Sequence, residues 1–206
     1  MYQQKTYRIK GLTPTMLHSG QLANPLSPIA KEIKRFTSKK KKTDEDLGTV
    51  SKLEWLGCFY FEKEGGFDVK GNDVKITASY GRPNWPAANI ERMLQDAAAK
   101  NKLGKQFKAG VTILDDAPII YDGPSTIEEL LGQQKFSSTV PAKVQRSTVM
   151  RTRPIFREWE LEFTVHFMPD IVDEHSLDEA VEIAGKLIGL SDYRPKYGRF
   201  EVQRAN

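Results

Sequence analysis

The feature that most constrains the fold of this chain is a strictly alternating segment near its C-terminus. Trp159, Leu161, Phe163, Val165 and Phe167 are separated by single residues that are mostly polar. Because successive side chains of a strand point to opposite faces, this spacing predicts a half-buried β-strand. One apolar and one polar face are typical of an antiparallel sheet that packs against helices on one side.

A helix, a loop and another strand are expected after this segment. A capping-box pattern begins at Ser176, and Gly189 predicts the end of the helix. The loop would span Leu190–Tyr197 and the final strand Gly198–Val202. The sequence therefore predicts a strand–helix–loop–strand unit from about Phe156 to Gln203.

An N-terminal strand over Gln3–Lys10 and a helix over Ala87–Lys100 extend this pattern. Strands joined through helices predict an α+β fold, specifically a ferredoxin-like (RRM-like) antiparallel sheet with helices on one face and insertions. The length of 206 residues suits a single domain over residues 1–206, with an inserted subregion of about residues 30–110.

Three further segments carry local predictions. Cys58–Phe61 has the pattern of a buried strand, and Ser125 with Glu128 has the spacing of a capping box. Asn101–Gly110 is basic and punctuated by glycine, so it is expected to be a loop whose backbone can approach a ligand closely.

Composition excludes several classes of protein. Cys58 is the only cysteine, which excludes an internal disulfide and a Cys-rich zinc site and fits a reducing compartment. The first residues, Met1–Lys5, have no apolar segment of a secretory signal, and no apolar run approaches the length of a membrane span. We therefore expect a cytoplasmic protein with no membrane partner.

No motif for catalysis or cofactor binding is present. The sequence contains neither a nucleophile elbow nor a phosphate-binding loop of the Walker type, and its histidines and acids lack metal-ligand spacing. We expect no enzyme activity, no cofactor and no metal. An alternative is a metal-independent RNase, for which His18 would be the candidate general base because it lies in a Gly- and Ser-rich loop.

Basic residues set close to aromatic residues are the remaining signal. Lysine and arginine bind phosphates, and aromatic rings stack on unpaired bases. No acid lies between Lys143 and Arg157, although the chain holds 27 acidic residues. The run Lys39–Lys42 is better interpreted as a solvated loop. The candidate nucleic-acid-binding residues are Lys100, Lys102, Lys105, Phe107, Lys108, Arg146, Arg151, Arg153, Arg157, Arg194, Lys196 and Arg199.

Three stretches resemble an uncharacterised group of tailed-bacteriophage and prophage proteins. They are Leu17–Leu26, Arg151–Trp159 and Ile188–Val202. The resemblance spreads over nearly the whole chain and implies a phage-encoded protein, but it implies no particular activity.

The C-terminal quarter also resembles the closing element of the Cas7- and Cas5-like RAMP proteins of CRISPR effector complexes. The likeness rests on a helix, a loop that starts with glycine and the strand Tyr197–Val202. It implies a ferredoxin-like core that binds RNA, often as an oligomer along the strand. The loop Leu190–Tyr197 is poorer in glycine than the loop of that superfamily.

These observations favour a phage-encoded, non-catalytic protein that binds single-stranded RNA or DNA through its phosphates, as a homo-oligomer. A second hypothesis is a phage structural or host-interaction protein, such as an inhibitor of a host defence complex. Its basic surfaces would then contact an acidic host or phage protein partner.

Overall fold

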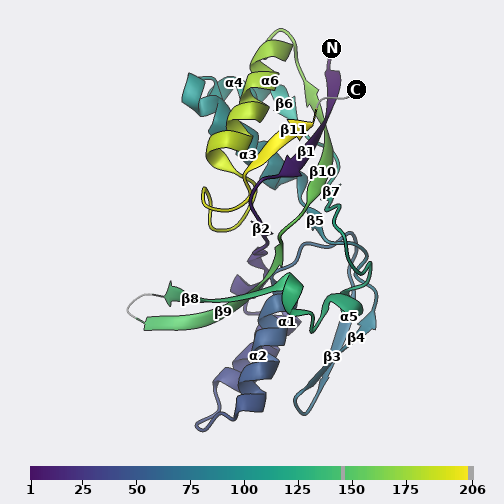
Figure 1. Cartoon of the computed structure of the whole chain (residues 1–206), viewed down its shortest axis with the longest axis vertical. Coiled ribbons are helices and arrows are strands. Elements are labelled where there is room, and N and C mark those ends of the chain that lie inside the picture. Colours follow the sequence, from purple (N-terminus) through teal and green to yellow (C-terminus); the bar gives the residue numbers. More distant parts are fainter. Residues whose placement is uncertain (145–146, 204–206) are drawn as a thin grey trace. The chain divides into compact units, whose positions relative to one another are not determined.

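The structure is a computed structural model that describes residues 1–144 and 147–203 (Figure 1). It mixes helices with antiparallel sheets, which confirms the α+β class. The chain divides into two compact units. The first unit comprises Met1–Met16, Asn84–Asp122 and Phe156–Asn206, and the second comprises Leu17–Pro83 and Gly123–Ile155.

This division has other bounds than the predicted subregion of residues 30–110. It places Asn84–Gly110 with the first unit, and it adds Gly123–Ile155 to the second. The expectation of a single domain over residues 1–206 stays a prediction.

A four-stranded sheet organises the first unit. Its strands are β1 (Gln3–Gly11), β6 (Val111–Thr112), β10 (Glu160–Phe167) and β11 (Phe200–Gln203), in the spatial order β11-β1-β10-β6. All neighbouring pairs are antiparallel. Tyr7 lies opposite Phe163, and Ile9 lies opposite Leu161. These four side chains are buried, as the alternating pattern predicted.

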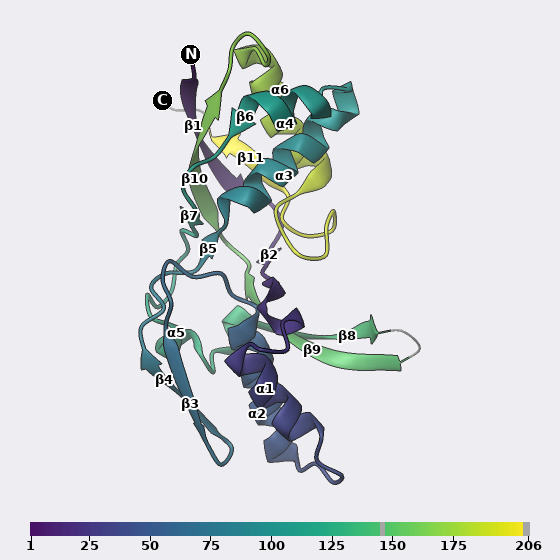
Figure 2. The same cartoon turned by 180° about the vertical axis from the view of Figure 1, so that it is seen from behind.

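Helices cover one face of this sheet. They are α3 (Ala87–Ala98), α4 (Gly104–Gly110) and α6 (Glu174–Ile183), which continues into a π-helical turn over Ala184–Ile188. They lie on the same side of β1 and β10 in two opposite views (Figures 1 and 2). Two short strands, β5 (Asn84–Trp85) and β7 (Ala117–Pro118), pair beside the sheet, and β2 (Thr15–Met16) follows β1 in sequence.

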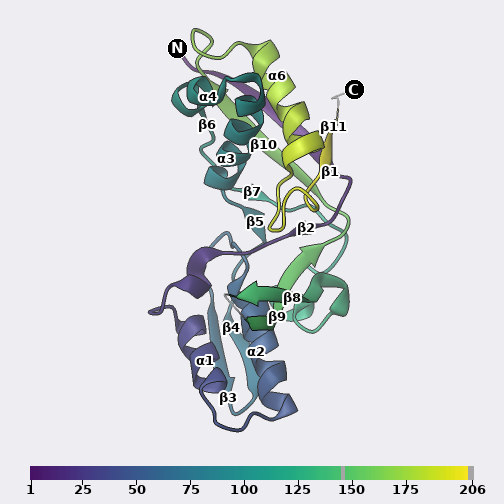
Figure 3. The ribbon, with the colours of Figure 1, turned by 90° about the vertical axis from the view of Figure 1, so that its left-hand side faces the viewer.

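The second unit consists of helices and β-ribbons. Its helices are α1 (Pro28–Thr37), α2 (Asp44–Gly57) and α5 (Ile127–Leu130), and α1 packs against α2 (Figure 3). Strands β3 (Gly66–Lys70) and β4 (Asp73–Ala78) form one antiparallel ribbon. Strands β8 (Ser137–Val144) and β9 (Ser147–Phe156) form the other.

Helix α2 begins directly after a capping residue, Thr43. The Thr43 hydroxyl accepts a hydrogen bond from the Asp46 backbone N–H at 3.2 Å, and the Asp46 carboxylate accepts one from the Thr43 N–H at 3.1 Å. This reciprocal arrangement satisfies two N–H groups that a helix start leaves without partners.

Several local predictions are wrong. Cys58 follows α2 directly, and Phe61 makes only an isolated bridge to Pro83, so Cys58–Phe61 is not a strand. Thr126, not Ser125, caps α5 by accepting a hydrogen bond from the Glu129 N–H.

Helix α6 likewise begins earlier than the capping-box pattern indicated. Asp173 accepts a hydrogen bond from the Ser176 N–H at 2.8 Å, so Ser176 lies inside the helix. An acidic or hydroxyl side chain three residues before an N–H is enough for a cap. Both helix starts contain more than one residue that could act as the cap, so the sequence alone does not identify the capping residue.

Candidate nucleic-acid interface

Four exposed lysines lie at the end of α3 and on α4 in the first unit. Lys100 is in a 3-10 turn over Ala99–Asn101, and Lys102 has the left-handed backbone of a helix end, with φ of 63°. Lys105 and Lys108 are three residues apart on α4, so they share one side of that helix. Lys100, Lys102, Lys105 and Lys108 are called the lysine patch below, and no ion pair joins any of them to an acid among the described residues.

The lysine patch lies where α4 packs against the end of α3, whereas the sequence led us to expect a loop over Asn101–Gly110. A Cβ on Gly104 would lie 3.2 Å from the Ala99 Cβ, so glycine lets α4 approach the end of α3. A Cβ on Gly110 would lie 2.9 Å from the Ile171 Cβ, so the absence of a side chain lets this segment pack there. The two glycines therefore allow close packing within the chain, and backbone access for a ligand was the wrong interpretation of them.

Phe107 is buried and is not available for the predicted stacking on bases. Its side chain is 0% exposed, between the lysines that flank it in sequence. A fully buried ring presents no face to an unpaired base. Phe107 instead anchors α4, and the lysines at positions 105 and 108 remain outside because they lie on the solvent side of the same helix.

The charge of the lysine patch contrasts with the rest of its unit. Of the 31 lysines and arginines of the chain, 14 fall in the first unit, and of the 27 acids, 16 do. The first unit is therefore slightly acidic, whereas residues 99–110 carry four lysines and no acid. Such local separation of charge is what an electrostatic footprint for phosphates requires.

The loop Leu190–Tyr197 is held by the segment that follows β1. The Leu190 N–H donates to the Gly198 carbonyl at 2.8 Å, and the Leu190 carbonyl accepts from the Thr15 hydroxyl at 2.6 Å. The Gly198 N–H donates to the Pro14 carbonyl at 2.8 Å, and φ of 77° at this position favours glycine. These interactions leave mainly the side chains of the loop for a ligand.

The basic side chains of this loop have partners within the chain. The Arg194 guanidinium lies 3.8 Å from the Asp96 carboxylate, and the Arg199 Nε donates to the Pro195 carbonyl at 3.0 Å. The Lys196 ammonium lies 5.6 Å from the centre of the Tyr197 ring. They remain exposed, so they stay candidates for phosphate contact.

Arg92 joins this group, and sequence reasoning missed it. It lies on α3 and forms an ion pair of 2.9 Å with Asp96, four residues later, which from sequence is an ordinary surface pair on a helix. Together with Arg194 it lines a small cavity of about 190 Å³ whose other lining residues include Asn89 and Ser191. One carboxylate therefore faces two guanidinium groups, which leaves the cavity with a net positive charge.

The open face of the four-stranded sheet has a different character. Arg8 on β1 lies opposite Glu162 and forms an ion pair of 2.7 Å with Glu160. Lys10 lies opposite Glu160 on one side and Glu201 on the other. On the described residues of these strands, no Phe, Tyr or Trp is exposed on this face. A face rich in glutamate does not provide a platform for stacked bases.

The predicted arginines that precede β10 in sequence have different local environments. Arg151 donates from Nη1 to the Oε1 of Glu54, and the same carboxylate accepts from the Thr152 N–H at 3.0 Å. Glu54 is 4% exposed, so Arg151 holds β9 to α2 within the second unit. Arg153 is half-buried, Arg157 is exposed in the first unit, and Arg146 lies outside the described residues.

The lysine run Lys39–Lys42 also contains a structural cation. The Lys39 ammonium lies 2.6 Å from the carboxylate of Asp46, whose side chain is 6% exposed. Hydrogen bonds from Lys39, from the Asn72 amide and from the Thr43 N–H hold the pKa of Asp46 well below its usual range. The other lysines of the run are exposed, in agreement with a solvated segment.

His18, the candidate base of the alternative RNase hypothesis, is in the second unit. Its Nδ1 lies 3.3 Å from the Sγ of Cys58, which is 2% exposed. This interaction occupies one ring nitrogen with a buried thiol. In the described part of the chain, no group of three or more His, Cys, Asp and Glu side chains could hold a metal ion.

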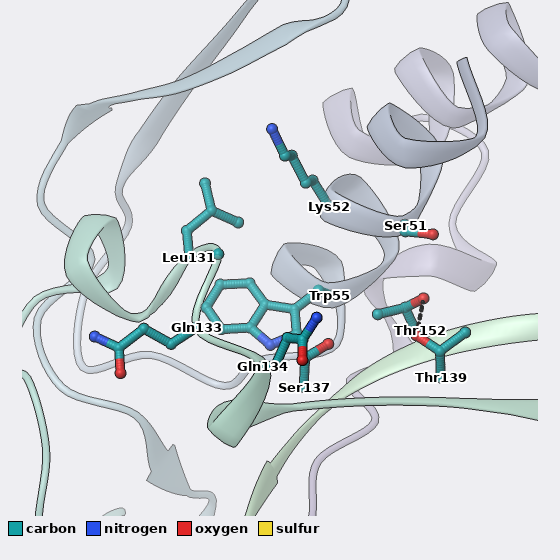
Figure 4. A pocket seen from close by; sticks show the side chains of 10 residues that line it. Ser51, Lys52, Trp55, Leu131, Gln133, Gln134, Ser137, Thr139 and Thr152 are labelled. Carbon is teal, nitrogen blue, oxygen red and sulfur yellow. Dashed lines mark hydrogen bonds between the residues drawn. The ribbon is translucent and has the colours of Figure 1, made fainter. Parts of the chain in front are cut away.

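A pocket that the sequence did not indicate lies in the second unit, between α2, the segment Leu131–Gln134 and the β8–β9 ribbon (Figure 4). Its residues come from three stretches that are distant in sequence, so no local pattern could have revealed it.

Among the helices that the structure describes, none is both long and apolar enough to cross a membrane.

A scan against protein-family models found no model that matches the chain, and a search of curated proteins found no significant match. The function is therefore inferred from the geometry of the residues described above.

Proposed function

We propose that this protein binds single-stranded RNA or DNA without catalysis, through contacts of its lysines and arginines with backbone phosphates. The lysine patch carries this proposal. Its four ammonium groups are exposed and have no acidic partner among the described residues, although their unit contains more acids than bases. Exposed lysines that form no ion pair and lie close together on packed helices are typical of a phosphate-binding surface.

The topology of the first unit supports a ferredoxin-like fold. In chain order its strands are β1, β6, β10 and β11, and their spatial order is fourth, first, third, second. Helix α3 follows the first strand and α6 follows the third, with all neighbouring strands antiparallel. This order agrees with that of a split βαβ fold. It supports the resemblance to RAMP proteins, and with it the proposal of an RNA-binding protein that assembles as a homo-oligomer. The separate resemblance of Leu17–Leu26, Arg151–Trp159 and Ile188–Val202 to phage proteins is the basis for proposing that the protein is phage-encoded.

The open face of the sheet is not suited to binding RNA by base stacking. Sheets of this kind bind RNA when exposed aromatic residues on the central strands stack on bases. Here Glu160, Glu162 and Glu201 occupy that face and would repel phosphates. We therefore place phosphate contacts on the lysine patch and on the exposed basic residues beside Arg92 and Arg194.

A salt titration with labelled single strands tests this proposal. Removing one lysine–phosphate interaction should reduce the slope of log K against log salt by about 0.7 for a single strand. The variant in which Lys100, Lys102, Lys105 and Lys108 are all alanine should therefore lower the slope by about 2 to 3 and the affinity at low salt by more than tenfold.

The matched control replaces lysines that already have acidic partners. Lys70 lies 3.8 Å from Asp68, and Lys186 lies 2.8 Å from Glu182. The variant Lys70→Ala, Lys186→Ala should bind almost as the parent protein does. No binding by the parent protein at low salt would overturn the proposal, and retention of a protein from host lysate after nuclease treatment would favour the host-interaction alternative.

A further inference from the structure

The loop Leu190–Tyr197 of the first unit carries an exposed aromatic ring. The side chain of Tyr193 is 59% exposed. Among the described residues, Tyr2 is the only other aromatic residue that is mainly exposed to solvent. No hydrogen bond joins the Tyr193 hydroxyl to another described residue, whereas the hydroxyls of Tyr7 and Tyr60 each donate one. The Tyr193 ring is therefore available to a ligand on its solvent side.

The backbone of Tyr193 has an uncommon conformation. Its φ of 67° lies in the left-handed region, where the Cβ of a bulky residue approaches the following carbonyl oxygen. Lys102 is the only other described residue besides glycine with positive φ, and it ends a helical turn, where this conformation is common. Backbone strain of this kind persists where the surrounding structure imposes it, often at ligand-binding sites. The conformation of Tyr193 therefore favours a role in binding over a role in stability.

Hydrogen bonds on both sides of Tyr193 hold the loop in place. The Asp192 N–H donates to the Met16 carbonyl at 2.7 Å, and the Met16 N–H donates to the Ser191 hydroxyl at 2.9 Å. The Tyr193 carbonyl accepts a hydrogen bond from the Tyr197 N–H at 3.4 Å. Because the loop is already ordered, a ligand that contacts the ring loses little affinity to ordering it.

A second tyrosine limits where a flat ligand can lie. The rings of Tyr193 and Tyr197 have centres 6.1 Å apart and planes inclined at 40°. A base inserted between two rings would need about 7 Å, because stacked bases are about 3.4 Å apart. The two rings leave no room for a base between them. A base would therefore stack on the side of Tyr193 that faces away from Tyr197.

Three exposed cations follow the ring within six residues of it. They are Arg194, Lys196 and Arg199. Lys196 and Arg199 form no ion pair among the described residues, and Arg194 forms only a long one of 3.8 Å with Asp96. A nucleotide offers both a flat base and an anionic phosphate, so it uses the ring and the cations together.

We propose that Tyr193 stacks on one unpaired base of a bound single strand, while the cations that follow it contact the neighbouring phosphates. This inference rests on the proposed function and adds a base contact to phosphate binding. The described residues of the four-stranded sheet expose no aromatic ring on the open face, so the loop supplies the stacking ring that the sheet lacks. Bases in a duplex have their faces covered by neighbours, so this contact favours single strands.

A comparison of normal and abasic strands isolates the stacking contact. Labelled oligo-thymidine and an abasic oligomer of the same length carry the same phosphates, but only the first carries bases. Tyr193→Asn removes the ring, and asparagine adopts the left-handed conformation more readily. Tyr193→Phe keeps a ring of nearly the same size. Tyr2→Asn makes the same change as the test variant at the other exposed tyrosine, which is 53% exposed and precedes two glutamines.

The parent protein should bind oligo-thymidine about tenfold more tightly than the abasic oligomer. Tyr193→Asn should lose this preference, because it weakens oligo-thymidine binding about tenfold and changes binding of the abasic oligomer less than about twofold. Its slope of log K against log salt should equal that of the parent protein, because no charge is removed. Tyr193→Phe and Tyr2→Asn should bind both oligomers within about twofold of the parent protein.

Thermal unfolding separates stacking from a structural role of the ring. Tyr193→Asn should melt at the same temperature as the parent protein or higher, because the backbone strain is reduced. A lower melting temperature with equal losses for both oligomers would overturn the proposal, since the ring would then support the loop.

The same titrations distinguish this inference from the proposed function. Equal binding of both oligomers by the parent protein, or a preference that survives in Tyr193→Asn, would overturn stacking on Tyr193 and leave phosphate binding intact. Binding of neither oligomer by the parent protein would overturn both proposals. Unchanged oligomer binding by Tyr193→Asn, together with loss of a host protein that the parent retains after nuclease treatment, would overturn base stacking in favour of a protein partner.

Discussion

The lysine patch of the first unit and the basic residues of the second unit use positive charge in different ways. In the patch, four lysines are exposed and have no acidic partner among the described residues. In the second unit, Lys39 and Arg151 each bind a carboxylate that is almost fully buried, on Asp46 and Glu54. A cation beside a buried carboxylate maintains the fold, because that carboxylate would be costly without it.

This difference shows that a cluster of basic residues in a sequence can contain both cations that stabilise the fold and cations that are available to a ligand. Arg151 belongs to an arginine-rich stretch without acids, yet Glu54, its partner, is 97 residues away. The burial of the acidic partner distinguishes a structural cation from one that is available to a ligand. The predictions below test this distinction, from the largest expected effect to the smallest.

The largest effect on stability should come from Phe107, the buried side chain that anchors the helix of the lysine patch. Phe107→Ala should lower the free energy of unfolding by about 3–5 kcal/mol, because it leaves a cavity where a fully buried ring was. Urea denaturation followed by circular dichroism measures this. Phe107→Leu, which keeps most of the apolar volume, should cost clearly less. Equal stability of Phe107→Ala and the parent protein would show that α4 does not depend on this ring.

Removal of the Glu54 carboxylate should have the next largest effect. Glu54→Ala leaves the Thr152 N–H without its acceptor and Arg151 without its counter-charge, so it should destabilise the protein by about 2–3 kcal/mol. The double variant Lys105→Ala, Lys108→Ala should change stability by less than about 0.5 kcal/mol, since these lysines are exposed and unpaired within the described chain. Thermal unfolding of both proteins at one pH compares them. Similar losses would contradict the distinction between structural and available cations.

The smallest effect concerns the pH dependence that Asp46 contributes. Its pKa is lowered in the folded protein, so its ionised form stabilises the fold above the unfolded pKa of about 4, and this contribution is lost as the pH falls below that value. The difference in melting temperature between the parent protein and Asp46→Asn should therefore be constant from pH 5 to 7 and shrink below about pH 4.

Asp44→Asn is the matched control for this experiment. Asp44 is exposed and lies two residues before Asp46 in the same helix turn. Its substitution should change the melting temperature little at any pH. A difference for Asp46→Asn that persists undiminished to pH 2.5 would show that the carboxylate charge is not what stabilises α2.

Short-range patterns in the sequence determined the elements that build the first unit. The alternation from Leu161 to Phe167 predicted β10 and its buried face, and Gly189 correctly marked the end of the long C-terminal helix. Side-chain alternation and capping depend on residues only a few positions apart, so a sequence displays them directly.

Only the tertiary structure decided which residues are available to a ligand. It buried Phe107, turned the glycines around it to internal packing, and paired Arg151 with a distant glutamate. It also brought Trp55 together with Gln134 and Ser137 around one pocket. Burial and charge pairing depend on residues that the fold brings together from distant parts of the chain. The sequence by itself therefore determined the α+β class and a surplus of positive charge, and the packed structure decided where that charge is free to act.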